Sequence, residues 1–111
     1  MIFILQEDII YGIIMSAKKQ EIRENFRNDV FKRDGYICKF CNKTEDLDAH
    51  HITPRKEMPN GGYVKSNGIT VCPLHHKFVE SPDCTLSILS LYSLIGSSYE
   101  QAYEDSLNLN K

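Results

Sequence analysis

The stretch LDAHHITPRKE, residues 47–57, places two histidines side by side in a segment that has the pattern of a short β-strand. Successive side chains of a strand point to opposite faces of the sheet. His50 and His51 therefore cannot easily share one task. The pair predicts two imidazoles with separate roles, one on each side of the strand.

Charge is unevenly distributed along this chain of 111 residues. Its 13 Lys and Arg against 15 Asp and Glu give a formal net charge of −2, which by itself does not support nucleic-acid binding. Residues 50–79, however, are locally basic, whereas residues 80–111 are acidic. A local field of this kind can attract phosphate groups. The length suits one small domain, whose modest core calls for extra stabilisation such as a metal.

Two short motifs have the spacing of zinc knuckles. Cys38 and Cys41 form Cys-x-x-Cys, and Cys72 and His75 form Cys-x-x-His. Each pair can supply two ligands to the same ion from a tight turn. Together the two pairs complete the tetrahedral shell of one Zn²⁺. Because four protein ligands close the shell, we predict a structural zinc whose binding stabilises the fold. The alternatives are buried, reduced cysteines, or Cys84 in place of His75 as the fourth ligand.

The start of the chain bears on compartment. Residues 1–15 are apolar but contain Glu7 and Asp8, and they lack the pattern of a secretory signal. They are also too short and too charged to span a bilayer, so we expect no membrane association. Reduced thiols and a cytoplasmic protein are then favoured over a secreted disulfide protein. A thioredoxin-like role for the Cys-x-x-Cys motif is opposed by the lack of a βαβ pattern around it.

The segment before the cysteines has helical periodicity. Ile22, Phe26 and Val30 recur every four residues and form one apolar stripe. Ser16 is a plausible N-cap. The pattern predicts a helix over residues 16–33 that ends at Asp34-Gly35.

The remaining elements are shorter. Residues 47–52 and 69–71 predict two strands, joined by a long loop rich in Pro, Gly and Asn. Residues 72–80 predict a helix, because a proline suits its first turn. Residues 85–96 fit either a strand or a helix, and residues 97–109 predict a last helix.

Three histidines are left once His75 is assigned to zinc. Neighbours in a helix point about 100° apart, so His76 can face the first strand while His75 faces the zinc. If it meets one of the strand histidines, two imidazoles form a half-filled metal site. Such a site keeps positions open for water and substrate.

The order of these motifs resembles the HNH endonuclease family. The resemblance covers about residues 23–80 and includes the lead-in VFKRDGYICKFC, then AHHITP, an Asn, and CPLHH. It implies a ββα-metal (His-Me finger) core, in which two short strands, the loop between them and a helix hold one catalytic metal. The expected fold is therefore α+β: a small single domain with this core, an N-terminal helix and a structural zinc knuckle.

The resemblance also assigns roles to residues. His50 resembles the first metal ligand of the family, and His76 resembles the second. His51 resembles the general base. Asn67 resembles the residue that fixes the loop and orients the base, with Asn60 as a competitor for that role.

Two positions depart from the family pattern. The fourth zinc ligand is commonly Cys and is His75 here, beside Cys38, Cys41 and Cys72. Some members carry another His where this chain has Glu80. That carboxylate either binds a hard cation or is a surface residue. The catalytic divalent metal stays open among Mg²⁺, Mn²⁺, Ni²⁺, Co²⁺ and Zn²⁺.

The implied activity is metal-dependent hydrolysis of phosphodiester bonds in DNA. A cation neutralises the leaving oxygen, while a base on the other side takes the proton of the attacking water. Histidine suits the base role, because its ordinary pKa of about 6.5 lies near working pH. We expect basic residues of the middle segment to contact DNA phosphates: Arg55, Lys56, Lys65 and Lys77.

The alternative is a non-catalytic zinc module that binds nucleic acid or protein on the same scaffold. A pure binder has no need of His50, His51, Asn67 and His76 together, which argues against it.

The domain organisation follows from these motifs. We expect residues 1–15 to be an apolar leader without an assigned role, residues 16–82 the nuclease domain, and residues 83–111 a C-terminal extension packed on it. No separate DNA-reading domain is evident, as in small HNH members of phages and mobile elements. A targeting protein partner is therefore an open alternative, as is the choice between monomer and homodimer.

Overall fold

Two short strands, β1 (Asp48–His51) and β2 (Gly68–Val71), form an antiparallel sheet in the middle of the chain. The computed structural model describes residues 6–109. His50 pairs with Ile69 and His51 with Gly68. β2 is buried along its whole length and β1 is half-buried. Both strands lie within a residue of where the sequence predicts them.

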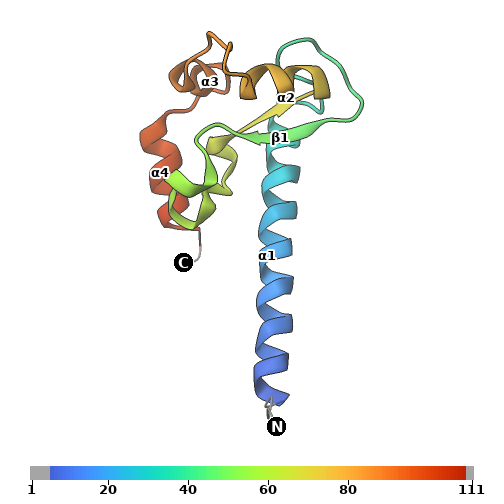
Figure 1. Ribbon diagram of the computed structural model, residues 1–111, viewed down its shortest axis with the longest axis vertical. Helices are drawn as coiled ribbons and strands as arrows, with labels where there is room; N and C mark the ends of the chain where they lie inside the picture. The colour runs from blue at the N-terminus through green and yellow to red at the C-terminus, as the bar shows by residue number, and fades with distance from the viewer. Residues whose placement is uncertain (1–5, 110–111) are drawn as a thin grey trace.

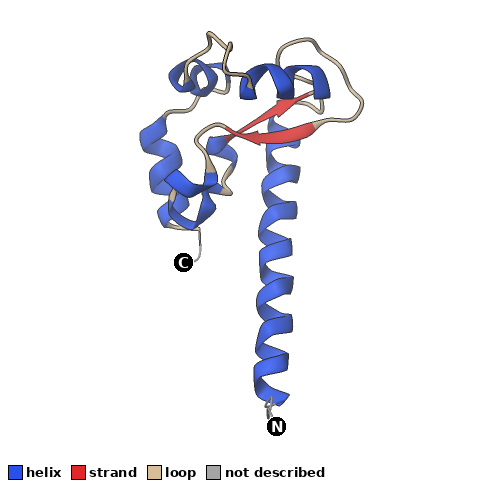
Figure 2. Cartoon of the chain, in the orientation of Figure 1, coloured by secondary structure: helices blue, strands red, loops and turns tan. Residues whose placement is uncertain are grey.

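Helices make up most of the remaining structure (Figure 2). One of them follows β2 directly and packs against both strands, which completes the ββα order that the sequence predicts. The fold class is α+β. In chain order the helices are α1 (Gln6–Arg33), α2 (Pro73–Glu80), α3 (Ile88–Leu94) and α4 (Tyr99–Leu107), and 3-10 turns at Arg55–Glu57, Pro59–Gly62 and Lys65–Asn67 lie between the strands.

Helix α1 is longer than predicted. Its 28 residues span about 42 Å, and its N-terminal half projects away from the rest of the molecule (Figure 1). The prediction of a helix start at Ser16 is wrong, because Ser16 lies inside α1 and is exposed. Gly12 is the one weak helix former nearby, and a lone glycine is tolerated in a helix. Of the predicted leader, residues 1–5 lie outside the described residues.

The C-terminal half of α1 packs closely on β2. Phe26 and Val30 are buried there, as the apolar stripe predicts. A Cβ atom at Gly68 would lie 2.5 Å from Cγ2 of Val30 and 2.7 Å from Cε2 of Phe26. Only glycine therefore allows the helix and the strand to approach so closely.

A buried carboxylate fastens the end of α1 to the sheet. Asp34 accepts hydrogen bonds from the Thr70 backbone N–H at 2.9 Å and from the Arg33 guanidinium at 2.8 Å. Burial by itself raises the pKa of Asp34, but these hydrogen bonds outweigh it and the pKa lies below its usual value. The charged form is thus built into the junction between α1 and β2.

The C-terminal helices cover the other side of the sheet. Residues 85–96, for which the sequence allows strand or helix, contain α3. Leu91 and Tyr92 of α3 and Ala102 of α4 join Ile69 and Val71 of β2 in the core. This core cluster thus joins β2 to the C-terminal helices.

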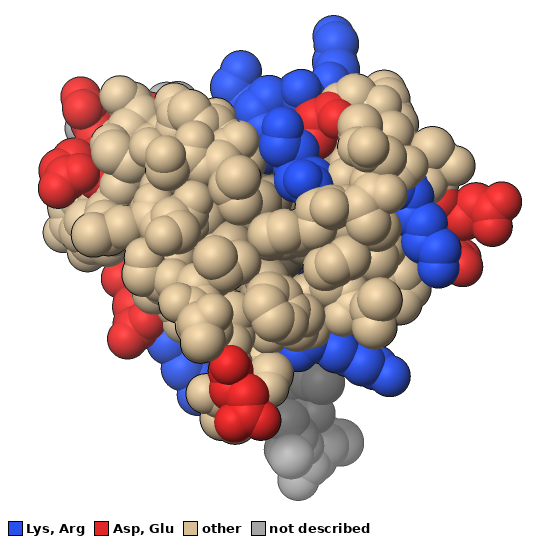
Figure 3. All heavy atoms as spheres, turned by 90° about the horizontal axis from the view of Figure 1, so that it is seen from above, with Lys and Arg blue, Asp and Glu red and all other residues tan. Residues whose placement is uncertain are grey.

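None of the described helices is both long enough and apolar enough to cross a membrane. The surface carries both signs of charge. On the face in Figure 3, one group of Lys and Arg side chains extends from the upper edge toward the middle and others lie near the right and lower edges, while most Asp and Glu side chains stand at the margin. The small net charge therefore hides locally basic surface.

Candidate metal centres

The first metal centre joins the two knuckles. The ligand atoms of Cys38, Cys41, Cys72 and His75 all lie within 4.8 Å of one another. Sγ of Cys41 and Cys72 are 3.7 Å apart, and Nδ1 of His75 is 3.8 Å from Sγ of Cys38. Ligands about 2.3 Å from a tetrahedral Zn²⁺ are separated by about 3.8 Å. The donor set and its spacing therefore fit zinc.

Local structure prepares these ligands. Cys72 is the N-cap of α2, and its Sγ accepts a hydrogen bond from the backbone N–H of His75 at 3.5 Å. That hydrogen bond is the largest of the effects that lower the pKa of the Cys72 thiol to about 6, which favours the metal-binding thiolate. The ring of Phe40 stacks on His75 at 5.2 Å. Cys84 lies outside the cluster and contacts the carbonyl of Leu86.

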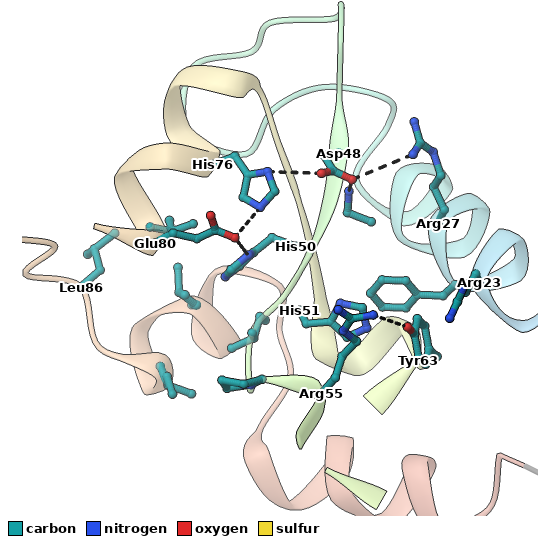
Figure 4. Close-up of a pocket in the computed structure, with 17 residues that line it drawn as sticks. Arg23, Arg27, Asp48, His50, His51, Arg55, Tyr63, His76, Glu80 and Leu86 are labelled. Carbon is teal, nitrogen blue, oxygen red and sulfur yellow. Dashed lines mark hydrogen bonds and ion pairs between the residues drawn. The ribbon is translucent and has the colours of Figure 1, made fainter. Parts of the chain in front are cut away.

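The second centre lies between β1 and α2. His50, His76 and Glu80 present ligand atoms within 4.8 Å of one another. Oε1 of Glu80 is 2.8 Å from Nε2 of His76 and 3.8 Å from Nδ1 of His50 (Figure 4). The sequence left Glu80 open between ligand and surface, and the structure brings it into this cluster. Its place one helical turn after His76 is the reason.

An outer pair of side chains orients the helix histidine. Oδ2 of Asp48 is 3.2 Å from Nδ1 of His76, so the opposite nitrogen of the ring faces Glu80. Arg27 of α1 in turn lies 3.9 Å from Asp48. A carboxylate on the second ring nitrogen is the usual support of a metal-binding histidine. Sequence reasoning missed Asp48, although it stands two residues before His50 and hence on the same strand face.

His51 points to the other side of β1 (Figure 4). Its ring stacks on Phe26 with centroids 4.4 Å apart and meets the ring of Tyr63 at 4.7 Å in a T-shaped contact. Nε2 of His51 is buried and has no hydrogen-bond partner among the described residues. Burial, followed by the charge of Arg55, lowers the pKa of His51 to about 4. The imidazole is therefore neutral at ordinary pH.

Asn67 is fully buried and fixes the loop between the strands. Its Nδ2 donates to the carbonyls of Thr53 and Gly62, both at 3.1 Å. Its Oδ1 accepts from the Thr53 backbone N–H and from the Tyr92 hydroxyl. These four hydrogen bonds use both donors of the amide and both acceptor positions of its oxygen. None of them goes to His51.

The competing asparagine lies elsewhere. The Nδ2 of Asn60 donates to the carbonyl of Ser106 on α4, at 2.8 Å. Asn60 has φ of 54° and sits in a turn, where Asn tolerates a left-handed backbone. The structure thus places Asn67, and not Asn60, beside the end of β1, the strand that carries His50 and His51.

Both faces of β1 open on one cavity of about 810 Å³. Of the predicted phosphate contacts, Arg55 lines it, whereas Lys56 and Lys77 are exposed and do not. Lys65 lines a separate groove between α1 and α4. The residues that line the cavity include His50, His51, His76, Glu80, Arg23, Arg27, Arg55 and Tyr63.

Two arginines of α1 and a tyrosine complete the site. Nη1 of Arg55 donates to the Tyr63 hydroxyl at 2.9 Å. Burial raises the pKa of Tyr63, but hydrogen bonds from Arg55 and Arg23 outweigh it and the pKa lies below its usual value. Sequence reasoning missed Arg23 and Arg27. Their four-residue spacing predicts that they share one helix face, but it does not predict that this face meets the site.

Comparison with models of protein families matches residues 38–77 to the family described as HNH endonuclease. The match begins at the first knuckle cysteine and includes both strands and His76, while Glu80 and α1 lie outside it. Comparisons with curated proteins and with solved structures gave no match. Residues 38–77 are therefore similar to the HNH endonuclease family, in agreement with the order of the motifs in the sequence.

Proposed function

We propose that the protein is a metal-dependent endonuclease that hydrolyses phosphodiester bonds in DNA. One observation carries this proposal. A three-residue cation site (His50, His76 and Glu80) and a neutral imidazole (His51) lie on opposite sides of one short strand and line the same cavity. Hydrolysis of a phosphodiester needs a cation and a base that approach phosphorus from different directions.

The donor set of the second centre suits a divalent cation. Two imidazoles and one carboxylate leave coordination positions free for water and substrate. A cation held there would act as a Lewis acid that stabilises charge on the phosphate and on the leaving oxygen. Asp48 keeps His76 aimed at this position, and burial, the largest effect, lowers the pKa of His50, which favours the neutral ring that binds a metal.

The chain's own groups supply the other parts of the reaction. In our proposal, the neutral imidazole of His51 takes the proton of a water molecule that attacks phosphorus. Phe26 and Tyr63 hold the ring of His51 in one orientation. The guanidinium groups of Arg55 and Arg23 stand beside it and would bind the non-bridging phosphate oxygens.

The zinc knuckles have a structural role in this proposal. Three thiolates and one imidazole close the coordination shell, so no position is left for a substrate. A reduced thiolate cluster is typical of the cytoplasm, which supports that location for the enzyme.

Nicking of supercoiled plasmid tests the proposal. Purified protein with its zinc retained is given Mg²⁺, Mn²⁺, Co²⁺ or Ni²⁺ in turn, beside a His51→Ala variant and a Leu89→Ala surface control. We expect the wild type and Leu89→Ala to cleave, and His51→Ala to lose at least about 100-fold in rate while it stays folded. Folded wild type that cleaves with none of these metals would favour the non-catalytic binding module. Equal cleavage by all three proteins would point to a contaminant.

A further inference from the structure

The cavity at His51 does not end at the metal centre. A second cavity, of about 660 Å³, lies between α1 and the turn at Pro59–Gly62, and it shares Arg23 and Tyr63 with the first. Arg23 and Tyr63 therefore stand between two adjacent cavities. Beyond these two residues the wall on the α1 side is basic, because Lys18 and Lys19 line it.

The basic residues of α1 follow a regular spacing. Lys19, Arg23 and Arg27 are four residues apart, which puts them in one row with a rise of about 6 Å from each to the next. Lys18 and Lys19 are exposed, and no described carboxylate forms an ion pair with either. Their charges are therefore available to a ligand.

We propose that this row is a phosphate track, on which a DNA strand leaves the metal centre and runs along α1 toward Lys19 and Lys18. The inference rests on the proposed function, because it extends the substrate path of that site. Continuity favours DNA over an acidic protein, since the scissile phosphate must lie in the first cavity and Arg23 already reaches both. A backbone of regularly spaced anions matches a regularly spaced row of cations.

The row also explains what the long helix contributes. The ββα core is small, and the loop after β1 brings only Arg55 to the first cavity from among the predicted phosphate contacts. α1 adds cationic groups on a rigid element that is fastened to β2 through Asp34 and Gly68. The track is thereby held in a fixed direction relative to His51.

The salt dependence of DNA binding tests this inference. The protein used is the full-length His51→Ala variant, which binds without cleaving, with zinc retained and no other divalent metal added. Fluorescence anisotropy with labelled duplex and single-stranded DNA gives the slope of log K against log salt. For a duplex, the further change Lys18→Gln/Lys19→Gln should reduce that slope by about 1.8, since each lost phosphate contact removes about 0.9.

The matched control is Lys39→Gln/Lys43→Gln, which removes the same charge from the exposed knuckle loop. It should leave the slope unchanged. If the parent variant binds DNA with an unchanged slope after Lys18→Gln/Lys19→Gln, or if both pairs reduce it equally, the track is wrong and the nuclease proposal stands. If the folded parent binds neither form of DNA, both proposals fail.

Discussion

At the scale of single residues, His51 is held between two aromatic rings, and its Nε2 has no hydrogen-bond partner in the part of the chain that the structure describes. Phe26 supports one face of the imidazole and Tyr63 meets it edge-on. The Tyr63 hydroxyl binds Arg55, so this ring positions both the proposed base and a proposed phosphate ligand.

Tyr63→Ala should therefore reduce the rate of DNA cleavage by about 100-fold, because a small misplacement of a reacting group costs about that much. Tyr63→Phe keeps the ring contact and should lose less. Single-turnover cleavage rates measure the difference, with Tyr103→Ala on α4 as a control for loss of an exposed tyrosine. A Tyr63→Ala enzyme with an unchanged rate would mean that the ring does not position His51.

Asp48 acts on the metal centre through His76. Asp48→Ala should weaken binding of the catalytic cation by about 10- to 100-fold, which is typical when the partner of a metal-binding histidine is removed. Titration calorimetry with Mn²⁺ or Co²⁺ on zinc-retaining protein measures this affinity. Asp83→Ala removes an exposed carboxylate outside the cluster and should change nothing. Equal affinities for the Asp48→Ala variant and the wild type would contradict the positioning role.

The residues that the sequence predicted are those whose geometry is local. The spacing of Cys38, Cys41, Cys72 and His75 limits how they can chelate an ion, so the zinc cluster follows from the chain alone. Which face of α1 meets the sheet depends on contacts between distant segments. For that reason the sequence alone did not place Arg23, Phe26 and Tyr63 at the site.

At the scale of elements, those with a clear local sequence signal were predicted and those without one were not. β1 and β2 lie where the sequence predicts short strands on either side of a loop rich in Pro, Gly and Asn, and α2 begins at the proline expected in its first turn. The start of α1 was missed because Ser16 has the residue type of an N-cap, yet the helix continues through it. The apolar residues of 85–96 have no clear periodicity, so the sequence alone could not decide between a strand and the helix α3.

The contact between α1 and β2 depends on Gly68. Gly68→Ala should lower the free energy of unfolding by about 1–3 kcal/mol, the usual cost of overpacking a core. Val30→Ala in the same chain should recover part of that loss, because Cγ2 of Val30 is the nearest obstacle. Denaturant unfolding of the two single variants and the double variant measures this coupling. Additive losses would show that the two residues do not clash.

At the scale of the whole molecule, the candidate zinc site joins segments that lie far apart in the chain. The cluster ties residues 38–41 to residues 72–75, and both strands lie between them. In a domain with so small a core, the binding energy of a structural zinc, about 10–16 kcal/mol in peptides, is folding energy. Loss of the ion should therefore remove the catalytic centre as well.

Cys38→Ser should strip the zinc and abolish cooperative thermal unfolding, whereas Cys84→Ser should keep both the metal and the transition. Zinc content and circular dichroism on the two preparations test this pair. Cys84 is a suitable match because it is a free cysteine outside the cluster. A well-folded, zinc-free Cys38→Ser protein would mean that the core holds without the ion.

The Asn67-Gly68 pair makes the unfolded chain open to irreversible chemical damage. An Asn-Gly pair deamidates when the glycine nitrogen attacks the side-chain carbonyl carbon. In the folded chain, the amide is held by Thr53, Gly62 and Tyr92, and the N–H of Gly68 is bound to the carbonyl of Lys65. Unfolding frees both reactants, and the aspartate that forms cannot donate to the two carbonyls. If loss of zinc unfolds the chain, the fraction of molecules that can refold when the metal is restored should therefore fall with the time spent unfolded.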